Sequence, residues 1–249
     1  MHPVNRVLYQ VGLVLQKTRD TVFIPRAFQA EYWKRLSALR KNPRGFAIYS
    51  EELYETGSHP YSFQDFECGF ASLHITRTRP ARMLDVGSYR HFILGLLAHY
   101  PVTTIDVRPR SPINSNEEVI TGDAKRLPVA TGSFDVVVSL CAIEHFGLGR
   151  YGDDFDLDAD RAAMAEMTRC LKPGGRLIFS TTITRGAPQI VFNAHRIYTL
   201  ELIRGMCSGL EAEDERFYSR AAGGYCDPGS ISDQPEVWDV YLGCWRKPA

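Results

Sequence analysis

The sequence predicts an α/β protein with a Rossmann-like, doubly wound, mostly parallel seven-stranded sheet, an antiparallel hairpin at one edge and a helical N-terminal extension. Two observations support this fold class. From Ala81 onward, short apolar runs alternate with segments of helical periodicity, which is typical of a parallel sheet wound by helices. The last two apolar runs are joined by a loop without a helix, which indicates that their strands lie antiparallel.

The N-terminal extension, residues 1–78, contains three segments with helical periodicity. Helices are expected over residues 26–40 and about 66–76, before a main domain over 79–249. A first amphipathic helix either packs on its own domain or contacts a membrane surface or a protein partner through residues 1–20. Its apolar stripe consists of Val4, Val7, Leu8, Val11, Val14 and Leu15.

The main domain alternates strands and helices along its length. Strands are expected at 82–86, 102–106, 118–121, 134–140, 176–182, 211–218 and 236–245. Helices are expected at 90–99, 124–127, 158–171 and 199–208.

Composition excludes several classes of function. Lys plus Arg and Asp plus Glu number 29 each, so no overall field attracts nucleic acid, which is not expected as a partner. The six cysteines include no CxxC pair, which argues against a zinc site and a dense disulfide framework. The apolar stretches are shorter than the roughly 18 residues that a membrane span needs. We therefore expect a cytoplasmic protein.

Carboxylates follow three of the predicted strands. Ligands of open α/β sheets bind outside the carboxyl ends of the strands, so these positions are the first candidates for a site. Asp85 can accept hydrogen bonds from an ammonium group, and Asp106, 21 residues later, can bind both ribose hydroxyls of a nucleoside. Asp123 can accept from an adenine amino group. Alternatively, each is an ordinary N-cap or turn residue.

Two segments resemble class I S-adenosylmethionine-dependent methyltransferases. They are GSFDVVVSL at 132–140 and LKPGGRL at 171–177. The strings DVGS, IDVRP, GDAKRLP, IEHFGLGRYGDDFD and FNAHRIY further resemble a methyltransferase-like family linked to bacterial surface-polysaccharide biosynthesis. The resemblance implies S-adenosylmethionine as cofactor, bound by Asp85, Gly87, Ser88, Asp106, Val107, Asp123, Ala124 and Leu140.

The loop after the first strand departs from the methyltransferase pattern Asp-x-Gly-x-Gly-x-Gly. Tyr89 and His91 stand in place of the second and third glycines. S-adenosylmethionine has no pyrophosphate for such glycines to accommodate, whereas NAD and FAD do, so the loop argues against a dinucleotide. A non-catalytic binding or scaffolding protein that assists a partner enzyme is the alternative.

Catalytic candidates follow the fourth strand. Methyl transfer to a hydroxyl requires removal of a proton, and histidine titrates nearest to neutral pH. His145 is the expected base, with Glu144 beside it and His195 as the alternative base. His145 can instead serve only to order its loop.

Polar and aromatic residues near these candidates are expected to bind the acceptor. They are Arg150, Tyr151, Asn193 and Tyr198, although Arg150 can alternatively pair with Asp153 or Asp154. No metal is expected, because Glu144, His145, Asp153 and His195 match no standard ligand spacing. The predicted function is methylation of an oxygen, or less favourably a nitrogen, on a small-molecule or glycan acceptor.

Overall fold

The computed structural model describes residues 25–50, 54 and 62–249. The chain divides into two compact units, residues 1–60 and residues 61–249. In the first unit, helix α2 (Arg26–Lys41) confirms the helix predicted over 26–40. The ring of Phe28 contacts Tyr32 and Tyr54. The amphipathic segment predicted in residues 1–20 lies outside the described residues.

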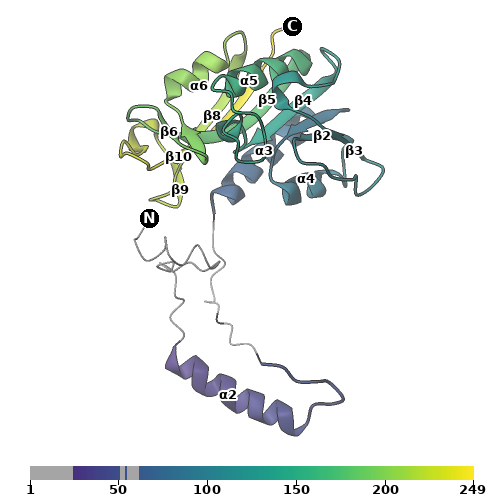
Figure 1. Cartoon of the computed structure of the whole chain (residues 1–249), viewed down its shortest axis with the longest axis vertical. Coiled ribbons are helices and arrows are strands. Elements are labelled where there is room, and N and C mark those ends of the chain that lie inside the picture. Colours follow the sequence, from purple (N-terminus) through teal and green to yellow (C-terminus); the bar gives the residue numbers. More distant parts are fainter. Residues whose placement is uncertain (1–24, 51–53, 55–61) are drawn as a thin grey trace. The chain divides into compact units, whose positions relative to one another are not determined.

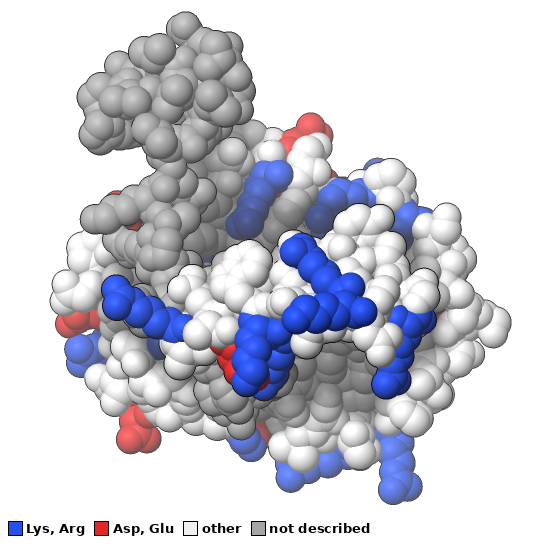
Figure 2. Space-filling view, turned by 90° about the horizontal axis from the view of Figure 1, so that it is seen from below, with Lys and Arg blue, Asp and Glu red and all other residues white. Residues whose placement is uncertain are grey.

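Helix α2 is strongly basic, although the whole chain has equal numbers of acidic and basic residues. Figure 2 likewise shows Lys and Arg predominating over Asp and Glu on the face of the molecule in view. The charged residues of α2 are Arg26, Glu31, Lys34, Arg35, Arg40 and Lys41.

The second unit contains an eight-stranded sheet of order β3-β2-β1-β4-β5-β10-β8-β9 (Figure 1). Strands β3, β2, β1, β4 and β5 are parallel, and β10 lies antiparallel between β5 and β8. The predicted mostly parallel sheet with an antiparallel edge is confirmed. The strands are β1 (Met83–Val86), β2 (Val102–Asp106), β3 (Glu117–Thr121), β4 (Phe134–Leu140), β5 (Leu171–Ile183), β8 (Glu211–Ser219), β9 (Gly224–Cys226) and β10 (Asp239–Arg246).

Three short strands were not predicted. Strand β9 adds an eighth strand where only a loop was expected, and β6 (Gln189–Val191) pairs with β7 (His195–Ile197) in a separate hairpin. Each has three residues, which is too few to show an alternating pattern. The hairpin matters for the site, because it holds Ala194 and His195 beside the end of β4.

Helices cover both faces of the sheet and create two apolar cores. Helices α3 (Phe63–Thr78) and α4 (Arg90–Leu96) pack on one face with Val136 and Val138 of β4. Helices α5 (Ala159–Cys170) and α6 (Leu200–Met206) pack on the other face with Val137. Alternate residues of β4 therefore serve opposite cores, which is why the strand reads as a continuous apolar run.

Helix α3 belongs to the unit that contains the sheet. It packs against β4, β5 and β10, with Phe70 and Ile75 fully buried. Its start is fixed by a capping box in which the backbone N–H of Ser62 donates to Asp65 Oδ2 at 2.7 Å. The compact unit consequently begins at residue 61, whereas the sequence placed the domain boundary between residues 78 and 79.

The parallel strands all end at one edge of the sheet. The C-terminus lies at the opposite end, because Arg246 of β10 pairs with Arg176 at the start of β5 (Figure 1). The short helices η2 (Ala124–Arg126) and η3 (Ile143–His145) follow β3 and β4 at the carboxyl edge. All six cysteines are free thiols. Among the described helices, none has the length and apolarity needed to span a membrane.

Candidate functional site

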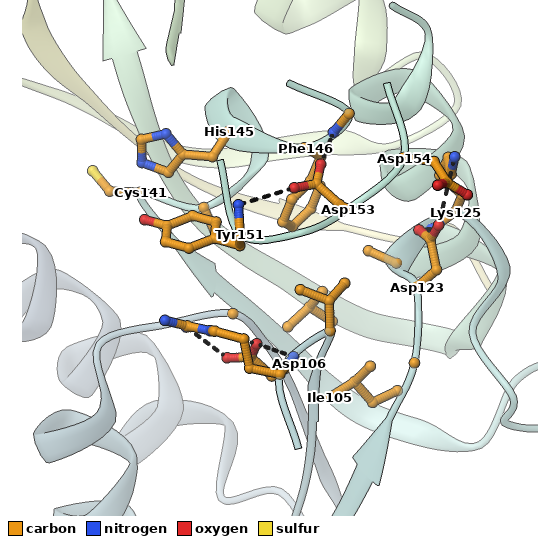
Figure 3. Close-up of a pocket in the computed structure, with 18 residues that line it drawn as sticks. Ile105, Asp106, Asp123, Lys125, Cys141, His145, Phe146, Tyr151, Asp153 and Asp154 are labelled. Atoms are coloured by element: carbon orange, nitrogen blue, oxygen red, sulfur yellow. Dashed lines mark hydrogen bonds and ion pairs between the residues drawn. The ribbon is translucent and has the colours of Figure 1, made fainter. Parts of the chain in front are cut away.

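Two adjoining cavities open at the carboxyl edge of the sheet. The inner cavity (Figure 3) is lined by Val86, Gly87, Ile105, Asp106, Val107, Arg108, Gly122, Asp123, Ala124, Lys125, Cys141, Ala142, His145, Phe146, Gly147, Tyr151, Asp153 and Asp154. The outer cavity is lined by Phe63, Gln64, Glu67, Gly87, Ser88, Tyr89, Arg90, Asp106, Arg108, Arg110, Leu140, Cys141, Glu144, His145, Arg150, Tyr151, Thr182, His195 and Trp238. Gly87, Asp106, Arg108, Cys141, His145 and Tyr151 line both cavities.

The loop after β1 borders both cavities. Gly87 has φ of 75°, and a Cβ at this position would lie 3.1 Å from the Cβ of Ala142. Asp85 is completely buried, accepts from the backbone N–H of Ser88 at 3.1 Å and lines neither cavity. Burial raises the pKa of Asp85 to about 6. Asp85 therefore shapes the loop, while Gly87 brings bare backbone to the cavities.

Two further predicted cofactor residues line the outer cavity. The backbone N–H of Leu140 donates to Ser88 Oγ at 3.0 Å, which joins the end of β4 to the loop after β1. Tyr89, which replaces a glycine of the methyltransferase pattern, is half-exposed and also lines this cavity, outside the inner one. The departure from the glycine pattern thus leaves the inner cavity unobstructed by the Tyr89 ring.

Asp106 at the end of β2 lies where both cavities meet, next to Val107 in the inner cavity. Its carboxylate accepts from Arg108 Nη2 at 2.9 Å and from Arg110 Nη2 at 3.2 Å. Burial acts to raise the pKa of Asp106, but these arginines outweigh it, so the pKa lies below the ordinary aspartate value. Asp106 is thus ionised at neutral pH and can accept hydrogen bonds from a ligand that displaces Arg108.

Asp123 lies at the far side of the inner cavity from Tyr151 (Figure 3), and Ala124 also lines this cavity. Asp123 Oδ1 accepts from the backbone N–H of Lys125 at 2.9 Å and so caps η2. Asp123 is thus an N-cap residue that also lines the cavity. Its side chain is 44% exposed, and its other oxygen, Oδ2, lies 3.5 Å from Lys125 Nζ.

His145 and Glu144 are presented by η3 just after β4. Nδ1 of His145 lies 2.6 Å from the carbonyl oxygen of Ala194. A carbonyl only accepts, so Nδ1 carries the hydrogen and Nε2 of the neutral ring is an unprotonated acceptor. Burial lowers the pKa of His145 to about 4 and raises that of Glu144 to about 8. At neutral pH both side chains are therefore uncharged.

The loop after η3 carries the predicted acceptor residues Arg150 and Tyr151. Arg150 Nη1 donates to the carbonyl of Ala194 at 3.2 Å, and its guanidinium lies over the Tyr151 ring. Asp153 accepts from the backbone N–H groups of Gly147 and Tyr151 at 2.6 and 3.2 Å. Arg150 forms no ion pair with Asp153 or Asp154, so the alternative of an internal salt bridge is not observed in this described loop.

Two histidines converge on the outer cavity. The rings of His195 in β7 and His145 lie 6.3 Å apart, and His195 also contacts Trp238 at 5.8 Å. Nε2 of His195 is buried and has no hydrogen-bond partner among the described residues. In the same part of the chain, no cluster of three or more His, Cys, Asp or Glu is arranged to hold a metal ion.

Asn193 and Tyr198 lie away from both cavities. Asn193 is exposed in the turn between β6 and β7 with φ of 56°. Tyr198 is buried, and its hydroxyl donates to Asp160 Oδ2 at 2.8 Å. The structure therefore places Tyr198 in a structural hydrogen bond, because the chain turns after β7 and directs the ring under α5.

Replacing Tyr198 with phenylalanine tests this structural role. We expect a decrease of about 1–2 kcal/mol in the free energy of unfolding, since Asp160 loses a buried hydrogen bond. Urea titration measures the decrease, and the affinity for S-adenosylhomocysteine should not change. If the variant has unaltered stability but fails to bind or methylate an acceptor, Tyr198 has an acceptor-binding role after all.

The sequence did not predict several lining residues. Glu67 reaches the outer cavity from α3, where it is buried and accepts from Ser180 Oγ at 2.6 Å. Its position among Phe63, Phe66 and Phe70 on one helix face was the available signal, because a glutamate in an apolar stripe has a specific partner or role.

The sheet order and the cavities at the ends of β1, β2 and β4 define the fold of class I methyltransferases. Residues 84–179 match a family described as "Methyltransferase domain". Segments of two curated relatives, both named malonyl-[acyl-carrier protein] O-methyltransferase, are similar to this chain. The protein of Laribacter hongkongensis is 31% identical over 129 residues (44% of this chain, 40% of the relative), and that of Methylococcus capsulatus 33% over 114 residues (41% and 38%). The matched segments thus span less than half of each relative.

Solved structures share the fold at low sequence identity. The N-methyltransferase NodS from Bradyrhizobium japonicum, solved with S-adenosylhomocysteine, is 19% identical (TM-score 0.53; 75% of this chain, 87% of that chain). The [4+2]-cyclase SpnF is 18% identical (TM-score 0.56; 89% and 94%). The presence of a cyclase among them means that function has to be argued from the site and not from the fold.

Proposed function

We propose that this chain is a cytoplasmic S-adenosylmethionine-dependent methyltransferase that methylates an oxygen of a small or carbohydrate-like acceptor. The observation that carries the proposal is the placement of Asp106, Asp123 and His145 around one cavity at the carboxyl edge of a methyltransferase-type sheet. The names of the two curated relatives support oxygen as the acceptor atom. The resemblance of residues 143–156 to a polysaccharide-linked family supports the carbohydrate-like acceptor.

The residues of the inner cavity fit the nucleoside part of the cofactor. Asp106 would accept from the ribose hydroxyls, and Asp123 with Ala124 would contact the adenine. Gly87 lines both cavities without a side chain, which permits close approach of the cofactor. Ser88 and Leu140 line the outer cavity, where the amino-acid part would lie.

The cofactor supplies an electrophilic methyl group, and the protein orients the acceptor and takes up its proton. His145 Nε2 would accept the proton that an acceptor hydroxyl loses when it is methylated. The hydrogen bond from Nδ1–H to the carbonyl of Ala194 fixes this tautomer and holds the ring at the junction of the two cavities. Orientation of the acceptor against the methyl group supplies the remaining acceleration.

Titration calorimetry with S-adenosylmethionine and S-adenosylhomocysteine tests the cofactor site, with Asp106→Ala as the informative variant. We expect the substitution to weaken binding by about 1–3 kcal/mol, because charge-assisted hydrogen bonds to the ribose are lost. Asp233→Ala is the matched control, since Asp233 is an exposed carboxylate that pairs with Arg185 outside both cavities.

The outcomes separate the proposal from its alternative. Binding that Asp106→Ala weakens and Asp233→Ala preserves supports the cofactor site and justifies an acceptor screen with labelled cofactor. Absence of binding to both compounds would contradict the proposal and favour a non-catalytic scaffolding protein.

A further inference from the structure

We propose that the acceptor carries an anionic group, a phosphate or a carboxylate, which Arg150 and Arg220 bind at the mouth of the outer cavity. This inference rests on the proposed function, because it identifies the chemical class of the acceptor. It is carried by the charges around the cavity, by the free hydrogen-bonding capacity of these two guanidinium groups and by a buried imidazole nitrogen without a partner.

The charged residues that line the outer cavity leave an excess of positive charge. Arg90 pairs with Glu117 through Nη2 and Oε2 at 2.8 Å. Arg108 and Arg110 share the single carboxylate of Asp106. The remaining lining acids are Glu67 and Glu144, and burial raises the pKa of both. With a pKa of about 8, Glu144 is uncharged at neutral pH and does not offset the arginines.

Most N–H donors of the Arg150 guanidinium have no hydrogen-bond partner among the described residues. It forms a hydrogen bond to the carbonyl of Ala194 at 3.2 Å and has no carboxylate within salt-bridge distance among the described residues. Its Nη1 lies 3.4 Å from Nδ1 of His145, which already donates to Ala194. A guanidinium has five N–H donors in a planar fork that matches phosphate and carboxylate. An anion bound to Arg150 would lie close to His145, the proposed base, because the two side chains are neighbours.

Arg220 adds a further positive charge beside Trp238 of the outer cavity. Its guanidinium lies over the ring of Trp238 at 4.0 Å from the centroid, and it likewise has no salt-bridge partner in residues 62–249. Trp238 lines the outer cavity and contacts the His195 ring. Burial lowers the pKa of His195, and the charges of Arg150 and Arg220 lower it further.

His195 contributes the second, independent observation. Its Nε2 is buried without a hydrogen-bond partner among the described residues, although a buried polar atom is normally paired. Arg150 and His195 line the outer cavity, and Arg220 lies on Trp238, which lines it as well. A hydroxyl or acidic oxygen of an anionic acceptor would satisfy the nitrogen while the arginines bind its charge.

Histidine ring NMR signals of the full chain, loaded with S-adenosylhomocysteine, test this site directly. Sodium phosphate and sodium malonate are titrated separately at constant ionic strength, and the signals of His145 and His195 are followed. We expect saturable shifts with at least one anion, and a dissociation constant raised about tenfold in Arg150→Gln and in Arg220→Gln. Arg185→Gln, which removes an exposed arginine outside the cavity, should bind as the wild type does.

Tighter binding of phosphate supports a phosphorylated acceptor, and tighter binding of malonate supports an acceptor with a carboxylate. No saturable shift with either anion, or equal binding by wild type and both arginine variants, would overturn the inference. A preceding titration with S-adenosylhomocysteine separates the two proposals. If it binds and the anions do not, only this inference fails; if it does not bind, the proposed function fails as well.

Discussion

Replacing His145 with alanine is expected to lower kcat by about 10²-fold or more, the usual contribution of a general base. Nε2 of this ring is an unprotonated acceptor, because Nδ1 donates to the carbonyl of Ala194 at 2.6 Å. Affinity for S-adenosylhomocysteine should remain nearly unchanged, since the cofactor contacts assigned to Asp106 and Asp123 stay in place. Single-turnover rates with labelled cofactor, measured on an acceptor found by screening, give the comparison.

The pH profile separates a base from a residue that only orders the loop. Burial lowers the pKa of His145 to about 4, so the ring stays deprotonated from neutral pH down to about pH 5. We expect kcat to remain level over this interval and to fall as the pH approaches 4, whereas an ordinary histidine would lose its base form below about 6.5. His99→Ala is the matched control, because His99 is exposed and lines neither cavity. Full activity in His145→Ala would exclude His145 as base and favour His195 or catalysis by orientation alone.

The fold could be predicted from the sequence because the core strands are buried on both faces and therefore appear as continuous apolar runs. Strand β4 serves both cores, so Phe134–Leu140 appears as an uninterrupted apolar run. Pro173 and Gly174, which has φ of 75°, mark the turn before the buried part of β5. Strands β6, β7 and β9 have three residues each and depend on tertiary pairing, which leaves no local signal.

Residues of the candidate site could be predicted only where the order of the strands in the sheet determines the position of the residue. Asp106 ends β2 and Asp123 follows the neighbouring strand β3, so the topology brings them into one cavity. Tyr198 illustrates the limit, because its distance along the chain from His195 is three residues but its side chain lies in the core with Asp160. Glu67 illustrates the converse, since the approach of α3 to the cavity depends on helix packing that no local pattern specifies.

Glu144→Gln is expected to stabilise the protein strongly above neutral pH. The pKa of Glu144 is about 8 in the folded chain, because the carboxyl is buried, against an ordinary value of 4.5. Between these values the folded state retains a proton that the unfolded state has lost, so the contribution to stability is complete below pH 4.5 and decreases until about pH 8. Glutamine cannot ionise, and its carbonyl can still accept from Thr181 Oγ1, which lies 3.1 Å from Glu144 Oε2.

We therefore expect the variant to exceed the wild type in free energy of unfolding by on the order of 4 kcal/mol at pH 8 and by little near pH 5. His145 has the opposite linkage: its lowered pKa makes stability rise with pH between about 4 and 6.5, so the comparison is clearest above pH 6.5. Urea titrations at several pH values measure the difference, with the exposed Glu201→Gln as control.

Parallel pH curves for Glu144→Gln and the wild type would mean that Glu144 is ionised in the folded protein. Its Oε1 lies 4.0 Å from Nε2 of His145, so a carboxylate there would favour the imidazolium and raise the pKa of His145. The acid limb of kcat would then move toward or above pH 6.5. The stability and rate measurements consequently both test whether Glu144 is neutral beside His145. A neutral Glu144 requires a stability difference that depends on pH, and it also requires that kcat fall only as the pH approaches 4.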